Sequence, residues 1–197
     1  MSHREFLLLS ATEPDRLGLV AEVTRFIAER GCNVEDSRLI ILGGYAGLMV
    51  LVSGEAAALR SVLDGLDQLR EQHGIRMAPR RVASRRPDVS APEVVVHARA
   101  IDQAGIIHAL AETVRLHGGS ILELESTTES APMTGEPLFR LRMKVRLPEA
   151  AGAEAELCRE LEAVAAGQGV ELELHPSQPR DGEMVLHGPE RRARDRE

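Results

Sequence analysis

Apolar and polar residues at the start of the chain follow first a strand-like and then a helical pattern. The apolar run EFLLLSA and the polar turn TEPD predict a buried strand that leads into a helix. Val20, Val23 and Ile27 recur at spacings of three and four, which is typical of an amphipathic helix, and we expect Gly31 to end it. The runs NVEDSRLIIL and YAGLMVLVSG flank a Gly-Gly pair and predict a β-hairpin.

A second helix and a last strand complete this unit. The segment EAAALRSVLDGLDQLREQHG predicts one continuous helix, and IRMAPRRV predicts the strand that follows it. The order of elements is therefore βαββαβ. The helix is expected to bury Leu59, Val62, Leu63, Leu66 and Leu69.

The same plan is repeated 87 positions later. DRLGLVAEVTRFIAERGCNV at residues 15–34 aligns without a gap with DQAGIIHALAETVRLHGGSI at residues 102–121. The two stretches share one Asp, two Gly and most apolar positions, as a duplicated supersecondary unit does. The second copy predicts a strand at EVVVHARAI, a helix at 104–117, a hairpin from SILELESTTE and LFRLRMKVRL, a helix carrying Leu157, Leu161 and Val164, and a strand at VELELHP.

The repeat divides the 197 residues into two small domains. We expect a first domain at 4–82, a linker at 83–92, a second domain at 93–177 and a disordered charged tail at 178–197. A four-stranded antiparallel sheet with helices on one face is the ferredoxin-like arrangement, so the predicted class is α+β with two such domains in tandem. This fold alone fixes no function.

Composition excludes several classes of function. A net charge of -7, no Trp, one Tyr and three Phe argue against a nucleic-acid surface. The arginines between 76 and 86 fit a solvated linker better than a phosphate or partner patch. The two cysteines and seven histidines form no metal-binding spacing, so we expect neither metal nor cofactor and two inert thiols. No apolar run approaches the ~20 residues that span a bilayer, which favours the cytoplasm.

The repeated strand-to-helix turn is the candidate binding chemistry. Asp15 and Asp102 stand where a helix N-cap is expected. Gly18 and Gly105, three residues further on, would leave the helix end open, where unpaired N–H groups and the helix dipole attract a carboxylate. The ammonium group of an amino acid would then need Asp15, a backbone carbonyl or Asn33. Two interpretations remain open, an amino-acid or small-anion site and a pair of caps with close helix packing.

The tandem βαββαβ pattern with DRLGLV and DQAGII resembles a pair of ACT domains, small modules that sense amino acids. The runs GCNVEDSRLIILGG, GLMVLVSG and TGEPLFRLRMKVRLP are similar to the glycine cleavage system transcriptional repressor family, over about residues 5–176. ACT domains commonly have Pro before the loop glycine, where this chain has Leu17 and Ala104, which puts the rigidity of the loop in question. The first loop is expected to be the better site because Ser120 replaces Asn33 in the second copy. The ligand residues that the resemblance implies are Asp15, Arg16, Leu17, Gly18, Leu19, Val20 and Asn33, and Asp102, Gln103, Ala104, Gly105, Ile106 and Ile107.

The resemblance implies a non-enzymatic regulator that senses a small amino acid, with glycine as the first candidate. It would act on transcription through a protein partner, without a DNA-binding motif of its own, and form homo-oligomers. A ligand-free dimerisation or assembly module is the alternative. An enzyme is disfavoured because no nucleophile stands beside a base.

Overall fold

The computed structural model describes residues 4–83, 91–130, 135–150 and 152–176. Contacts divide the chain into two compact units, Met1–Pro87 and Asp88–Glu197, and each is described by itself. Most of the expected linker and the whole expected tail lie outside the described residues.

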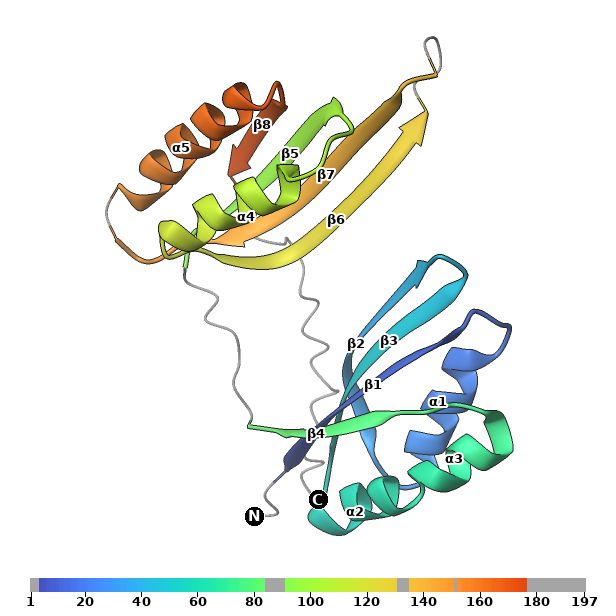
Figure 1. Cartoon of the computed structure of the whole chain (residues 1–197). Coiled ribbons are helices and arrows are strands. Elements are labelled where there is room, and N and C mark those ends of the chain that lie inside the picture. The colour runs from blue at the N-terminus through green and yellow to red at the C-terminus, as the bar shows by residue number, and fades with distance from the viewer. Residues whose placement is uncertain (1–3, 84–90, 131–134, 151, 177–197) are drawn as a thin grey trace, which may run out of the picture. The chain divides into compact units, whose positions relative to one another are not determined.

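The first unit is a four-stranded antiparallel sheet in the order β2-β3-β1-β4. Its helices lie on one face of the sheet (Figure 1). The fold class is therefore the ferredoxin-like α+β arrangement that the pattern predicted. Its elements are β1 (Glu5–Pro14), α1 (Leu19–Ala28), β2 (Asn33–Leu42), β3 (Tyr45–Gly54), α2 (Ala56–Asp64), α3 (Leu66–His73) and β4 (Ala78–Val82).

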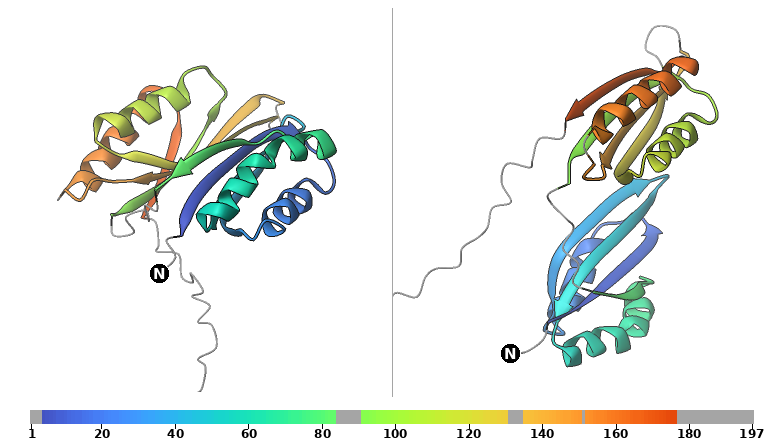
Figure 2. Two further views of the ribbon diagram at one scale, coloured as in Figure 1. Left: turned by 90° about the horizontal axis from the view of Figure 1, so that it is seen from below. Right: turned by 90° about the vertical axis from the view of Figure 1, so that its left-hand side faces the viewer.

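The second unit repeats this topology, with the strand order β6-β7-β5-β8. Figure 2 shows its two helices on one face of the sheet. Both units carry an irregularity near the start of the edge strand, between Val34 and Asp36 in β2 and between Ile121 and Glu123 in β6. The elements are β5 (Glu93–Ile101), α4 (Ile106–Leu116), β6 (Ser120–Ser130), β7 (Pro137–Arg146), α5 (Ala153–Gly167) and β8 (Glu171–Pro176).

Each unit has its own core between the sheet and its helices. Alternate residues of the central strands point to the helices, as the period of two requires, so Leu7 and Leu9 of β1 and Val50 and Val52 of β3 are buried. In the second unit the core residues include Val94, Val96, Leu141, Met143, Leu157 and Leu161. Val164, expected in this core, is only half-buried, and Ala165 is buried in the last turns of α5 instead.

The single helix expected over residues 55–74 was wrong. Two helices, α2 and α3, meet at Gly65. The guanidinium of Arg30 passes over this break, because a Cβ built on Gly65 would lie 2.7 Å from its Nε. The same group donates to Ser61 O at 3.2 Å and to Gln68 Oε1 at 3.2 Å, which ties α2 and α3 to the end of α1.

The end of α1 differs slightly from the expectation. The helix stops at Ala28 with Glu29 as its C-cap, and the left-handed Gly31 follows two residues later. The hairpin prediction is confirmed, since β2 and β3 are joined by Gly43 and Gly44.

Candidate functional site

In each unit a four-residue loop joins the first strand to the first helix. The backbone N–H of Asp15 donates to Gly44 O at 2.9 Å, and that of Asp102 donates to Pro137 O at 2.9 Å. Each loop is thereby fixed at its first residue to the neighbouring hairpin. The loops of the two units therefore begin with the same backbone hydrogen bond.

Asp15 and Asp102 are not the helix caps that the sequence suggested. The N-cap positions are Gly18, with φ 87° and ψ -7°, and Gly105, with φ 100° and ψ -9°, and neither helix has a side-chain cap. The left-handed turn at the glycine separates the aspartate from the first helical N–H groups. The Asp102 carboxylate instead accepts a hydrogen bond from Thr128 Oγ1 at 3.3 Å.

The uncapped helix starts have a chemical consequence. The first N–H groups of a helix have no partner within it and carry a partial positive charge. Without a capping side chain in α1 or α4, an external acceptor such as a carboxylate can bind there. The feature alone is not specific, however, because α5 begins in the same way at Gly152, with φ 85° and ψ -9°.

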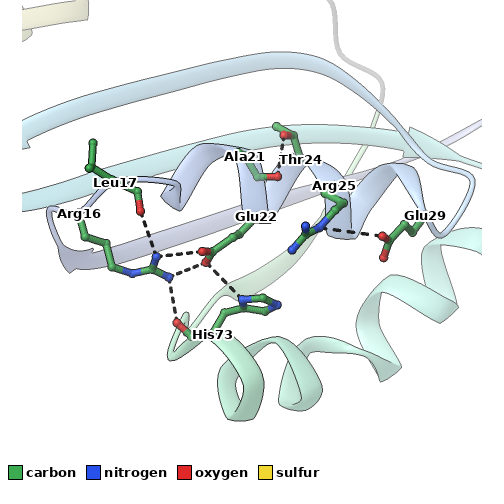
Figure 3. Close-up of polar contacts among 8 residues, drawn as sticks. All are labelled: Arg16, Leu17, Ala21, Glu22, Thr24, Arg25, Glu29 and His73. Atoms are coloured by element: carbon green, nitrogen blue, oxygen red, sulfur yellow. Dashed lines mark hydrogen bonds and ion pairs between the residues drawn. The ribbon is translucent and has the colours of Figure 1, made fainter.

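The first loop is clamped by the side chain of Arg16 (Figure 3). Arg16 Nη1 donates to Glu22 Oε1 at 3.0 Å. Arg16 Nη2 donates to Glu22 Oε2 and also to His73 O, the latter at 3.0 Å. His73 Nδ1 lies 3.4 Å from Glu22 Oε2. The hydrogen bonds from Arg16 hold the pKa of Glu22 below its ordinary value, and those same bonds raise the pKa of Arg16.

The second loop carries a simpler version of this clamp. Gln103, which occupies the position of Arg16, donates from Nε2 to Gln168 O at 2.7 Å. Both loops are thus fixed to the end of the last helix of their unit, at His73 in α3 and at the C-cap residue of α5. Ala109 stands where the first copy has Glu22, so Gln103 has no carboxylate partner at that position.

The space around the two loop glycines differs accordingly. A Cβ on Gly18 would lie 3.4 Å from Glu22 Oε1, whereas a Cβ on Gly105 would meet nothing within 4 Å. The second loop therefore offers more room beside its glycine than the first. Reasoning from the loop motif missed this difference, because Glu22 and Ala109 lie on the helices, four residues beyond the loop glycines.

Asn33 does not join the first loop. Pro14, at the loop end of β1, pairs with Tyr45 of β3, whereas Asn33 pairs with Ser53. These partners are eight residues apart along β3, roughly 27 Å at ~3.4 Å per residue. Asn33 donates instead to Glu35 Oε1 at 3.1 Å.

Ser120 occupies the same distant position in its own unit. It pairs with Arg146, while Ile101, next to the second loop, pairs with Leu138. The reason for ranking the first loop above the second therefore does not hold within a unit.

The remaining loop residues divide by burial. Leu19 and Ile106 are buried and attach the start of each helix to the core. Leu17, Val20 and Ile107 are exposed large apolar residues at the two loops. Ala104 is also exposed, so a ligand at either loop would lie at the surface.

Other reactive groups are sparse in the part of the chain that the structure describes. Its His, Cys, Asp and Glu residues form no group of three that could hold a metal ion. Cys32 is buried and Cys158 is half-buried, and burial raises the pKa of both thiols. Within the same residues, no helix has the length and apolar character needed to cross a membrane.

The comparison with protein families identifies the class of the first unit. Residues 5–78 match the model of the ACT domain. This match covers most of the first unit, and the second unit has the same sheet topology.

The chain resembles one regulatory protein in particular. It is 28% identical over 187 residues to the glycine cleavage system transcriptional repressor of Escherichia coli (strain K12), covering 90% of this chain and 97% of that protein. A crystal structure of an unknown protein from Galdieria sulphuraria is 26% identical with a TM-score of 0.73, and covers 89% of this chain and 100% of that one. A crystal structure assigned to a glycine cleavage system transcriptional repressor is 22% identical with a TM-score of 0.70, covers 90% and 99% of the two chains, and shows the shared fold.

Proposed function

We propose that this protein is a non-enzymatic regulator that binds a small amino acid, with glycine as the first candidate, and transmits its presence to a protein partner that controls transcription. The similarity to the E. coli repressor over 90% of the chain carries this proposal. An ACT domain in the first unit is consistent with it.

The two loops are the proposed ligand sites. A ligand carboxylate would accept from the uncapped N–H groups at the start of α1 or α4. The carboxylate of Asp15 or Asp102, or a loop carbonyl, would accept from the ligand ammonium group. Gly18 and Gly105 keep a side chain away from the helix start, which suits a compact ligand. The openness of the second loop makes it the stronger of the two sites.

A protein partner is proposed because the chain itself is poorly suited to nucleic acid. Its net charge is -7, and aromatic residues make up 2% of it. We expect the purified protein alone not to retard DNA at physiological salt. A sequence-specific shift in a gel-mobility assay would contradict this part of the proposal.

A thermal-shift screen of the twenty amino acids tests the proposal. A ligand that binds only the folded state stabilises it by about 2.7 kcal/mol at 100 times its dissociation constant, so a true ligand is easily detected. We expect glycine or another small amino acid to raise the melting temperature, and calorimetry then gives its affinity. If none of the twenty shifts the transition, the protein is not an amino-acid sensor.

A ligand-free assembly module is the second candidate. It is favoured by one observation, the row of exposed apolar residues on the edge strand β2. This candidate predicts self-association without any amino acid.

A further inference from the structure

The first unit has a groove beside its edge strand β4. β1 begins and β4 ends at the same end of the sheet, since Phe6 pairs with Val82 and Leu7 pairs with Arg81. The groove lies between these strand ends and α2, and its volume is about 410 Å³. Sites for small molecules usually have volumes of roughly 300–1,000 Å³, so this β4 groove has room for a small ligand.

The floor of the β4 groove is apolar. Leu7 of β1 and Leu59 of α2 are buried core residues that line it. Leu63, one helical turn after Leu59, also lines the groove, but it is only half-buried and packs against the edge of the core. Apolar surface that is left partly open to water gains free energy when a ligand covers it.

The second unit closes the same place with its own side chains. α5 is one uninterrupted helix, and its Leu157 and Leu161 are completely buried. Leu172 and Leu174 of the edge strand β8 pack against the same core. In the first unit, by contrast, residues 78–81 of the corresponding strand β4 are exposed. The ferredoxin-like fold therefore does not require an open groove beside this strand.

The rim of the β4 groove carries two guanidinium groups and one carboxylate. Arg81 Nη1 donates to Glu5 Oε2 at 3.3 Å, a long hydrogen bond, and these side chains are 67% and 42% exposed. Arg4 Nη1 lies 3.6 Å from Glu35 Oε1, which is too far for a hydrogen bond. Exposed ion pairs of this kind contribute little stability, so both guanidinium groups can bind another acceptor at small cost.

We propose that the β4 groove binds a small carboxylate with an apolar body. The body covers Leu7, Leu59 and Leu63, and the carboxylate accepts hydrogen bonds from Arg81, with Arg4 on the same rim. Arginine binds a carboxylate through two parallel N–H donors, and such charged bonds are stronger beside an apolar floor than in open water. An uncharged ligand would leave the guanidinium groups unused, and an ammonium ion would meet two positive groups and one negative group.

This site is separate from the ligand loop of the same unit. Glu5 and Pro14 are the two ends of β1, nine residues apart, which is roughly 30 Å at ~3.4 Å per residue. The β4 groove lies at the Glu5 end, whereas the loop follows Pro14. The ligand class differs as well, because the β4 groove requires no ammonium group.

Chemical-shift mapping with 3-phenylpropanoate tests the location of the site. This probe has a carboxylate on an aromatic body and no ammonium group. In two-dimensional proton–nitrogen spectra of the full chain, we expect it to shift the backbone amides of residues 4–7, 59–63 and 81–83 and to leave residues 15–18 and the second unit unchanged. The neutral 3-phenylpropanamide has the same body and should bind about tenfold more weakly, because hydrogen bonds to charged groups are the stronger ones.

Two neighbouring arginines of β4 provide a matched pair of variants. Arg81 lines the groove, whereas Arg80 pairs with Leu8 and points to the opposite face of the sheet. Arg81→Gln should weaken the binding of 3-phenylpropanoate about tenfold, and Arg80→Gln should leave it unchanged. Both arginines are exposed, and the same spectra verify that each variant is folded.

Four results would each overturn the proposal. They are shifts confined to residues 15–18 or spread over both units, no shift at the residues lining the groove at the solubility limit of the probe, binding of the amide as tight as that of the carboxylate, and equal loss of binding in Arg80→Gln and Arg81→Gln. None of them depends on whether an amino acid binds the loops. A failure of the amino-acid screen would likewise leave this titration unaffected.

Discussion

Replacing Gly18 by alanine separates the backbone role of this residue from its proposed role in binding. Gly18 has φ 87°, a conformation that L-residues rarely adopt. A methyl group there would meet Glu22 Oε1 at 3.4 Å, an ordinary contact. The expected cost is therefore conformational, about 1–2 kcal/mol. For a domain of this size it lowers the melting temperature by roughly 4–16 °C.

Gly105 provides a second test position, and Gly152 provides the matched control. Gly105 begins α4 with φ 100°, Gly152 begins α5 with φ 85°, and a Cβ at either meets nothing within 4 Å. All three alanine variants should lose a similar amount of stability. Amino-acid affinity, measured by calorimetry on the folded variants, should fall only for Gly18→Ala and Gly105→Ala, and most for the second because its loop is more open.

The possible results distinguish the two interpretations of these loops. If all three variants lose stability and all three bind the amino acid as tightly as the parent, the glycines serve the backbone alone and the loops are not the site. If Gly18→Ala is as stable as the parent, the conformational argument itself is wrong.

Three further predictions follow from individual contacts. Because the pKa of Glu22 is lowered, its bond to Arg16 stabilises the folded protein above the ordinary pKa of glutamate, and this stabilisation is lost as the pH falls through the lowered pKa. In Glu22→Gln the urea midpoint should therefore lose this part of its decrease at acid pH. Gly119→Ala should cost about 1–3 kcal/mol, because its Cβ would lie 2.9 Å from Val114 Cγ1, whereas Gly167→Ala, with open space in α5, should gain up to about 1 kcal/mol in thermal unfolding. Cys32 and Cys158 should react slowly with a thiol reagent at neutral pH until urea unfolds the chain, since burial raises both pKa values.

The sequence predicted the bounds of strands best where a turn signal, such as a Gly-Gly pair, agrees with the pattern of apolar residues. The bounds of β2 and β3 follow from two apolar runs around Gly43 and Gly44, and those of β5 from a single apolar run. The break at Gly65 was missed because Leu59, Val62 and Leu69 keep one helical period across it. The guanidinium of Arg30 lies over this break, and a residue so far away in the sequence leaves no local signature there.

The candidate site was predictable only in part for the same reason. The spacing Asp-x-x-Gly located both loops, but it is equally compatible with a capping aspartate and with a left-handed glycine as the N-cap. Strand direction places Asn33 at the far end of its sheet, a consequence of topology that residue type does not reveal. The clamp joins Arg16 to His73 across the whole unit, so proximity in the sequence could not indicate it.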